Sequence, residues 1–592
     1  MKKIFIYLVF YFLSSPVFSQ YYLRGEIKNE QNQPLSYAKI FVHSIRAIYY
    51  SGANSGSFGI STHKLVDSIT ITLEDYQPLT LAVQANAWQH IVLKPLPTVS
   101  SKASQKLISI SNDSKQENSD QTFSDDETYF KLVENDFTQA DDRSNTSFSL
   151  NVNKASYSNV RRFLNMSSQV PPDAIRVEEL VNYFNLNYQE PKAPSIFHVH
   201  PVLTNNPWNK EEQLLFINIS AKKINLDKIP PCNFVFLIDV SASMELPNRL
   251  SLIKSAFQLF VKNLRPIDTV SIVTYGENVE VSLSATSGAQ QERILTAIEK
   301  LEPYGETPGE SGIKLAYQVA NTQFIKNGNN RVILATDGDF NVGEKSEKGL
   351  DELITMERKT GIYLTCIGVG TGNLKDSKLQ TLAKKGNGNY VYLDNQKEAE
   401  RVFVKELTQT LYAVANNASM NIHFNPSLVK KYRLIGFDNK KEVLKTNEKT
   451  MEGGEVGSGS SVIAIFEIIP TEENNCIAFD QSGKEIAKLS LTYQSIEDST
   501  WSKDNFSVPL RLYNIDSTEK AYQFLAAVTM FGLQLKQSKY FNEVNWSFIE
   551  NFARKSADQN NFLQNEFLGL IAKAKKVYQY SEKRNKKKYL VF

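Results

Sequence analysis

The sequence predicts a multidomain protein of α/β and all-β parts. A doubly wound, Rossmann-like parallel-sheet domain is inserted between β-rich flanking regions, and a small β-sandwich precedes them. The 592 residues are too many for one hydrophobic core. Strand and helix patterns alternate within residues 229–412, which is typical of a mostly parallel sheet covered by helices on both faces. Strand-like runs without intervening helices lie on both sides of that segment.

The first 19 residues have the features of a secretory signal peptide. Lys2 and Lys3 precede the apolar run 4–13, and Pro16 and Ser19 provide a helix breaker and a small residue before the cleavage point. The run is shorter than the roughly 20 residues that span a bilayer. We therefore expect cleavage after Ser19 and an extracytoplasmic mature protein, which is periplasmic, associated with the cell envelope or secreted.

Residues 20–97 predict a small all-β unit, because short alternating apolar segments are separated by turns rich in Asn, Gly, Pro and Ser. The segments lie at 23–27, 38–42, 68–73 and 90–93. The Gln-Pro-Leu turn at 33–35 and the Asp-Tyr-Gln-Pro run at 75–78 resemble those of the carboxypeptidase regulatory-like β-sandwich of secreted Bacteroidetes-type proteins. That resemblance implies a non-catalytic spacer or adhesive module.

Residues 98–128 predict a disordered linker, because they are polar and poor in large apolar groups whose burial could offset the entropy of ordering. An ordered N-terminal flanking region is expected over residues 129–228. Within it, apolar residues recur at helical spacing over 157–164 and 177–184.

The α/β segment, residues 229–412, contains clear strand and helix patterns. The strands lie at 234–238, 269–274, 279–283, 332–335, 362–369 and 390–393. One apolar helix face runs from Leu250 to Leu264, and another from Ile313 to Phe324.

The C-terminal region, residues 413–592, predicts strands and then helices. The strands lie at 420–424, 432–436, 461–469, 486–493 and 507–513, and helical patterns follow from about 518 to 574. Strand-like runs at 196–202 and 214–219 precede the α/β segment. We expect the strands from both sides to pair into one β-sandwich.

Composition excludes some partners. The formal net charge is only +2, from 66 basic and 64 acidic residues, which gives no large field to hold a nucleic acid or an acidic membrane. Cys232, Cys366 and Cys476 are too few for a disulfide framework, so buried free thiols are expected.

Three oxygen-bearing side chains, Asp239, Ser241 and Ser243, follow the first strand of the α/β segment at alternate positions. Ligands of open parallel sheets bind outside the carboxyl ends of the strands, where these side chains would lie. Thr307 lies in a Gly-rich loop before the second helix face, and Asp337 follows the fourth strand. We therefore expect these five residues to come together at one edge of the sheet.

The five residues suit Mg²⁺ or Mn²⁺, which prefer oxygen ligands and keep several waters. Two carboxylates balance a divalent cation, and if they act through water the metal remains electrophilic toward an outside anion. The carboxylate of an Asp or Glu could then complete the coordination. In the alternative interpretation, Asp239 caps the following turn, and Ser241 and Ser243 satisfy backbone groups.

On these residues, the segment resembles a von Willebrand factor type A (VWA) domain with an intact metal-ion-dependent adhesion site (MIDAS). Further runs resemble bacterial secreted VWA proteins with characteristic N- and C-terminal flanking regions; they lie at 182–184, 335–343, 386–390 and 432–436. The resemblance covers about residues 129–575. It implies that Ser241, Ser243 and Thr307 touch the metal, whereas Asp239 and Asp337 bind it directly or through water.

The function expected from these features is metal-dependent protein interaction or adhesion, with a partner protein that presents Asp or Glu. We do not expect an enzyme. No histidine is directly followed by Glu, and the sequence contains neither a Gly-Xaa-Ser-Xaa-Gly elbow nor a Gly-Lys-Ser/Thr loop. A periplasmic metal-dependent hydrolase is the alternative, since a partly filled Mg²⁺ shell could activate water.

Overall fold

The computed structural model describes residues 21–95 and 127–589, with interruptions. The interruptions are residues 36–37, 46, 53–54, 63, 74–75, 86, 187, 226–228, 306–308, 339–343, 439–453, 473–482, 497–498 and 542–543, and the description also omits the side chains of residues 47–48, 61, 344–351 and 580–589. The chain divides into two compact units, Met1–Gln116 and Glu117–Phe592. The predicted signal peptide and most of the predicted linker lie outside the described residues.

The first unit contains two sheets around one apolar core. One sheet has the order β4 (Ser57–Thr62), β1 (Tyr21–Asn29), β7 (Trp88–Leu93), and the other β3 (Ala47–Tyr50), β2 (Lys39–Val42), β5 (Val66–Thr72), β6 (Leu79–Gln84). Leu23 and Ile27 alternate with exposed positions along β1 and pack with Ile69 and Ile71 of β5. The predicted small all-β unit is confirmed.

The α/β domain of the second unit contains a six-stranded sheet. Its order is β14 (Val279–Ser287), β13 (Thr269–Tyr275), β12 (Cys232–Asp239), β15 (Asn329–Thr336), β16 (Ile362–Val369), β17 (Tyr390–Leu393). All neighbouring pairs are parallel except β13 and β14. The predicted doubly wound sheet is therefore confirmed, with an antiparallel strand at one edge.

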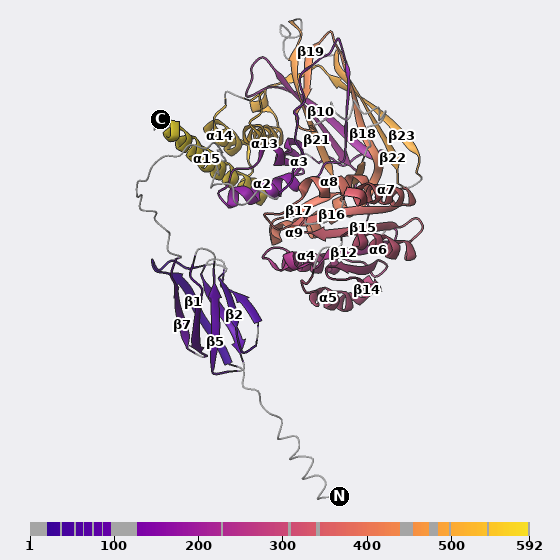
Figure 1. Ribbon diagram of the computed structural model, residues 1–592. Helices are drawn as coiled ribbons and strands as arrows, with labels where there is room; N and C mark the ends of the chain where they lie inside the picture. The colour runs from indigo at the N-terminus through magenta and orange to yellow at the C-terminus, as the bar shows by residue number, and fades with distance from the viewer. Residues whose placement is uncertain are drawn as a thin grey trace, which may run out of the picture. The chain divides into compact units, whose positions relative to one another are not determined.

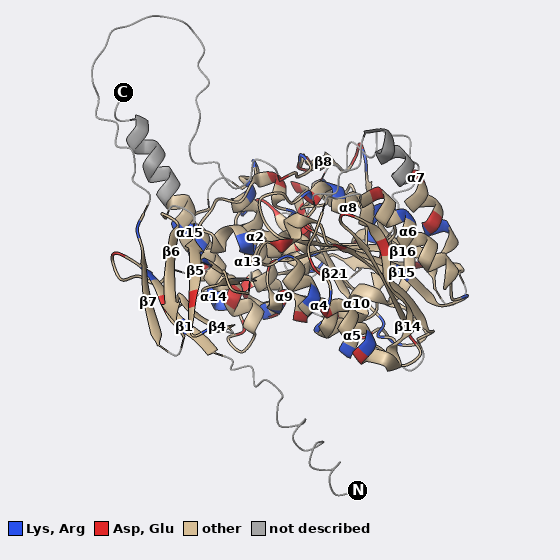
Figure 2. Ribbon diagram, turned by 60° about the horizontal axis from the view of Figure 1, so that its bottom comes forward, with Lys and Arg blue, Asp and Glu red and all other residues tan. Residues whose placement is uncertain are grey.

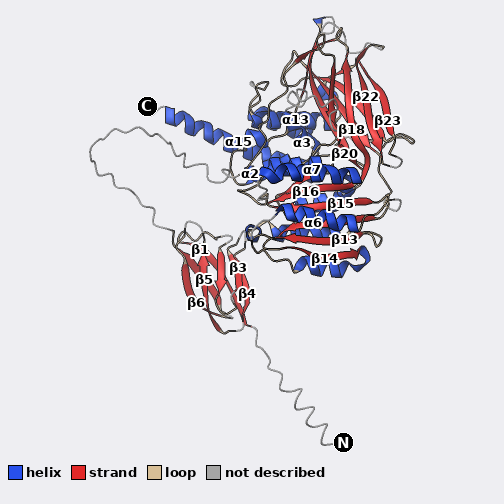
Figure 3. Ribbon diagram, turned by 45° about the vertical axis from the view of Figure 1, so that its right-hand side comes forward, coloured by secondary structure: helices blue, strands red, loops and turns tan. Residues whose placement is uncertain are grey.

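Helices cover both faces of this sheet (Figure 3). One face packs on α4 (Leu250–Lys262), α5 (Gln291–Glu299), α9 (Gln396–Glu400) and α10 (Leu407–Leu411), and the other on α6 (Gly309–Thr322), α7 (Glu344–Thr360) and α8 (Asp376–Lys385). Alternate residues of β12 take opposite sides: the Phe236 ring stacks on Phe257 of α4 at 4.1 Å, whereas Leu237 packs with Ile313 of α6. This central strand is therefore apolar at every position from 234 to 238.

Two further sheets form a sandwich from strands on both sides of the α/β domain (Figure 1). One has the order β24 (Leu512–Tyr513), β10 (Phe197–Asn205), β11 (Gln213–Ala221), β21 (Ser461–Pro470), β19 (Val429–Leu434), β8 (Thr138–Gln139). The other has the order β20 (Gly454–Gly457), β18 (Ala413–Phe424), β22 (Glu485–Ser495), β23 (Trp501–Pro509), and β9 (Asn145–Ser149) also pairs with β18. The expected sandwich, with the α/β domain inserted into it, is confirmed.

A helical layer covers the outer face of the first of these sheets. It comprises α2 (Ala155–Asn165), α3 (Val177–Asn182), α13 (Lys520–Lys536), α14 (Trp546–Ser556) and α15 (Phe562–Tyr589). In β11, Leu214 and Phe216 pack in the apolar core beneath the helices, whereas Leu215 and Ile217 pack in the apolar core between the two sheets. All positions of β11 are buried because each of its faces is covered.

The described part of the second unit begins at Glu127, within the predicted linker. Glu127 Oε1 accepts hydrogen bonds from Arg162 Nη1 at 2.6 Å and from the backbone nitrogen of Gly372 at 2.8 Å. The backbone nitrogen of Thr128 donates to Leu374 O at 3.0 Å. Glu127 and Thr128, the last two residues assigned to the predicted linker, are therefore held by contacts with α2 and with the loop after β16.

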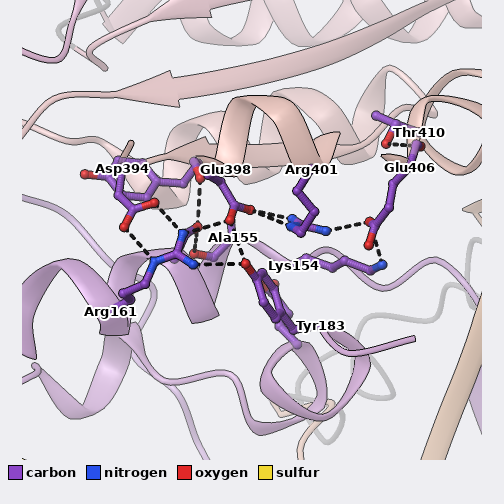
Figure 4. A network of polar contacts seen from close by, with 12 residues as sticks. Lys154, Ala155, Arg161, Tyr183, Asp394, Glu398, Arg401, Glu406 and Thr410 are labelled. Atoms are coloured by element: carbon purple, nitrogen blue, oxygen red, sulfur yellow. Dashed lines mark hydrogen bonds and ion pairs between the residues drawn. The ribbon is translucent and has the colours of Figure 1, made fainter. Parts of the chain in front are cut away.

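A buried series of ion pairs joins the α/β domain to the flanking helices (Figure 4). Arg161 Nη2 of α2 donates to Asp394 at 2.5 Å and to Glu398 at 2.7 Å. Arg401 pairs with Glu398 and, at 2.5 Å, with Glu406. Burial raises the pKa of Glu398, but the charges of Arg401 and Arg161 outweigh it and lower the pKa to about 2. Glu398 is therefore an anion at the junction between the domain and the helices.

Several surface and covalent features agree with the sequence. Basic and acidic residues are interspersed along the helices of the second unit (Figure 2), in keeping with the net charge of +2. Cys232 and Cys366 are buried free thiols, and burial raises the pKa of Cys232 to about 12. Cys476 lies outside the described residues. In the described part of the chain, no helix has both the length and the apolar character needed to cross a membrane.

Candidate metal centre

Asp239 and Asp337 lie at the carboxyl edge of the α/β sheet. Asp239 ends β12, and Asp337 follows β15, the neighbouring parallel strand. Both side chains are fully buried, with no exposed surface. The sheet order thus brings together two carboxylates that are about a hundred residues apart in the chain, at the edge where parallel α/β sheets bind ligands.

The carboxylate of Asp239 is held by four hydrogen bonds. Its Oδ1 accepts from the backbone nitrogen of Ser241 at 2.9 Å and from Ser241 Oγ at 2.6 Å. Its Oδ2 accepts from Thr336 Oγ1 at 2.8 Å and from Tyr275 Oη at 3.2 Å. Burial raises the pKa of Asp239 to about 6; the bonds from Ser241 oppose this rise, and the charge of Asp337 adds to it. Asp239 is therefore fixed in position. It also orients the loop that carries Ser241 and Ser243, the serine loop.

The serine loop is fastened to the Gly-rich loop that follows α5. Ser241 Oγ and Ser243 Oγ lie 3.2 Å apart, and the backbone nitrogen of Ala242 donates to Gly305 O at 3.0 Å. Gly305 has φ +84°, and a Cβ there would lie 2.3 Å from a backbone nitrogen, so only glycine fits this close approach. Thr307, two residues later, lies outside the described residues, and its place at the metal stays a prediction.

An arginine that the sequence reasoning missed contacts this site. Arg249, immediately before α4, donates Nη1 to Asp337 Oδ2 and to Ser243 O, the latter at 3.0 Å. Its Nη2 donates to Thr371 O at 2.9 Å and to Asn373 Oδ1 at 3.0 Å. Asn373 Nδ2 in turn donates to Asp337 Oδ2 at 3.0 Å. The loop after β16 thus contributes two residues, Thr371 and Asn373, to the surroundings of the site.

The described donors fit a hard divalent cation. Asp239, Ser241, Ser243 and Asp337 contribute only oxygen atoms, and two of the four are hydroxyls. Mg²⁺ and Mn²⁺ prefer such donors. In the described part of the chain no place, this one included, gathers three or more His, Cys, Asp or Glu side chains that could hold a metal, so a cation here would depend on the two hydroxyls as well as the two carboxylates. The hydrogen bonds from Asp239 to Ser241 also agree with a turn-capping role, so the geometry admits both roles of this loop.

Comparisons with known families agree with this architecture. The model for the von Willebrand factor type A domain matches residues 234–339, a von Willebrand factor model matches residues 123–216, and the model for the C-terminal part of the protein YfbK matches residues 409–577. YfbK from Escherichia coli (strain K12) is 35% identical over 476 residues, which cover 77% of this chain and 82% of YfbK. The chain belongs to the YfbK family. The VWA domain of this YfbK-family chain is therefore shown by sequence as well as by its sheet.

Other proteins match a smaller part of the chain or have a lower sequence identity. The inter-alpha-trypsin inhibitor heavy chain H2 of Homo sapiens is 27% identical over 25% of this YfbK-family chain and 16% of that protein. The solved structure of a von Willebrand factor type A protein from Catenulispora acidiphila is 13% identical, covers 63% of this chain and 88% of its own, and has a TM-score of 0.38.

Proposed function

We propose that this YfbK-family protein is an extracytoplasmic, metal-dependent protein-interaction or adhesion module. The metal would be Mg²⁺ or Mn²⁺. The residues that would hold it, directly or through water, are Asp239, Ser241, Ser243, Thr307 and Asp337. When bound, the ion supplies an electrophilic centre for an acidic side chain of a partner protein. The observation that carries the proposal is the placement of two buried carboxylates and two neighbouring hydroxyls at one edge of the VWA sheet.

Each described residue has a distinct part in this proposal. Asp239 already receives four hydrogen bonds, so its main task is to hold the loop that carries Ser241 and Ser243. The two hydroxyls provide neutral donors, which leave a bound cation with charge to attract an outside carboxylate. Asp337 provides the second negative charge from the neighbouring strand. The extracytoplasmic location rests on the signal-peptide features of the first 19 residues.

A capture experiment tests the function. The immobilised full chain is incubated with outer-membrane and periplasmic extract, once with Mg²⁺ and once with EDTA, and bound proteins are identified. We expect specific partners only with Mg²⁺, and none with Asp239→Ala or Thr307→Ala. Thr322→Ala, which changes an exposed threonine of α6, is the matched control and should retain all partners.

The alternative hydrolase activity is measured on the same samples. Partner capture that is insensitive to EDTA and to both variants would remove the metal from the mechanism. Turnover of a generic ester or phosphate substrate that is lost in Asp337→Ala would instead favour the hydrolase. Recovery of the mature protein only in the cytoplasmic fraction would contradict the proposed location.

A further inference from the structure

Arg249 occupies a socket built around its guanidinium. The residue is only 4% exposed, and four acceptors surround its two terminal nitrogens: a carboxylate oxygen of Asp337, the backbone oxygens of Ser243 and Thr371, and the amide oxygen of Asn373. Gly370, at φ +79°, forms one wall, since a Cβ there would lie 2.6 Å from Arg249 Nε. The guanidinium is therefore a fixed positive charge beside the predicted metal ligands.

Arg249 changes the charge of the centre. Asp239 and Arg249 are hydrogen-bonded to the loop of Ser241 and Ser243, and Arg249 also pairs with Asp337. These three residues contribute two negative charges and one positive charge. The two carboxylates alone would balance a divalent cation, but with Arg249 their sum is −1 instead of −2. A cation at this centre would therefore leave an excess of one positive charge, which one carboxylate from outside would neutralise.

We propose that Arg249 is a charge-setting residue of the metal centre, which weakens binding of the cation alone and makes firm binding depend on a carboxylate ligand. This inference rests on the proposed metal-dependent function and deepens it. The effect is large because charges interact strongly where the surroundings are buried and poorly hydrated. By linkage, a carboxylate that binds the loaded centre must tighten metal binding by the same factor by which the metal tightens carboxylate binding.

A purely structural role for Arg249 makes a different prediction. In that case the guanidinium only fastens the loop of Thr371 and Asn373 to Asp337. Loss of the side chain would then loosen the centre and weaken metal binding. The charge-setting role predicts the opposite sign, because removal of the positive charge strengthens the attraction of the carboxylates for a cation. The direction of the change in metal affinity therefore separates the two roles.

The test measures Mn²⁺ binding to the full chain by titration calorimetry, with sodium acetate as the carboxylate probe and sodium chloride at equal ionic strength as its control. In the wild-type protein, acetate should tighten Mn²⁺ binding. Arg249→Gln should bind Mn²⁺ roughly tenfold more tightly without acetate and should lose most of the acetate effect. Arg249→Lys keeps the charge and should behave like the wild type. Lys262→Gln, which removes an exposed charge at the far end of α4, should also be unchanged.

Thermal melting shows whether Arg249→Gln folds. If it does not, a second variant tests the same charge effect. Asn373→Asp retains Arg249 but adds a negative charge beside it, so it should also tighten Mn²⁺ binding and reduce the acetate effect. Absence of Mn²⁺ binding in every variant would reject the proposed metal-dependent function itself. If Mn²⁺ binds, but acetate has no effect in the wild type or Arg249→Gln and Asn373→Asp do not bind Mn²⁺ more tightly, the charge-setting role is overturned.

Discussion

The guanidinium of Arg161 lies 2.7 Å from the carboxylate of Glu398, and this contact joins a helix that precedes the VWA domain in the chain to a helix near the end of that domain. Both side chains are almost completely buried. A buried ion pair often adds little net stability compared with apolar residues of the same shape, but removal of one partner leaves an uncompensated charge. The pair therefore makes one relative placement of helix and domain strongly preferred.

Arg161→Met should lower the free energy of unfolding of the second unit by about 3–5 kcal/mol, because Glu398 and Asp394 lose a buried counter-charge. Urea denaturation followed by circular dichroism measures this loss. Glu400→Gln is the control on the same segment of the domain: Glu400 and Lys405 lie 3.4 Å apart and are largely exposed, so little change is expected. Equal effects of the two variants would contradict a role for burial.

Gly457 in β20 should not tolerate a side chain, because a Cβ there would lie 1.8 Å from the backbone oxygen of Gln409 in α10. Gly457→Ala should lower the melting temperature, with a loss of about 1–3 kcal/mol from forced displacement. Gly569 in α15 is the matched control, since nothing lies within 4 Å of its added Cβ. Gly569→Ala should raise stability by about 0.5–1 kcal/mol through helix propensity. A neutral Gly457→Ala would show that α10 moves freely.

Glu178 in α3 should make stability depend on pH. Burial, with a further contribution from the charge of Asp438, raises its pKa to about 7 from an ordinary value of about 4.5. The folded state therefore binds the proton more tightly, and stability falls as pH rises from about 4.5 to 7. Glu178→Gln should gain about 1–3 kcal/mol at pH 8 and nothing at pH 4. Urea denaturation at pH 4 and at pH 8 measures the free energy of unfolding of the variant and the wild type. Glu519→Gln, which changes an exposed glutamate, is the control. A gain of the same size at both pH values would refute this titration.

Metal binding should weaken in mild acid, because burial raises the pKa of Asp239 to about 6 in the metal-free protein. A proton on Asp239 competes with a cation at this centre, so Mn²⁺ affinity should fall as pH drops below 6 and level off above 7. Calorimetry in buffers of different ionisation enthalpy should detect proton release on binding at pH 5.5 but not at pH 8. An affinity that is constant from pH 5 to 8 would be inconsistent with this coupling.

The sequence was sufficient for most of the fold, since apolar periodicity is a local property of each strand and helix. The sequence analysis did not predict the helices that cover β11. A signal was present, because Leu214 to Ile217 are apolar at consecutive positions, which indicates a strand buried on both faces. The short strands β8 and β9 could not be found from composition. Backbone pairing such as that of Thr138 with Tyr432 joins residues almost three hundred positions apart and leaves no local signal.

The residues of the candidate site also differ in how far the sequence indicated them. Asp239, Ser241 and Ser243 were selected from the sequence because they alternate directly after a buried strand, and Asp337 because it follows another strand of the same sheet. The pairing of β12 with β15 brings these strand ends together, and the metal-binding role of the residues stays a prediction. Arg249 was missed, because its partners come from two other loops that only the folded sheet brings together. A signal was nevertheless present: an arginine directly before an apolar helix, six residues after the last serine.

The interleaved strands of the sandwich also determine the order in which the chain can fold during synthesis. β11 is made before the VWA domain, yet its partner β21 follows that domain, since Gln213 pairs with Ile468. A growing chain therefore completes the VWA domain while the apolar β11 still lacks that neighbour. Such unpaired strands aggregate readily. The domain that carries the predicted binding site can therefore fold before the sandwich that supports it, which closes only after β21 has emerged.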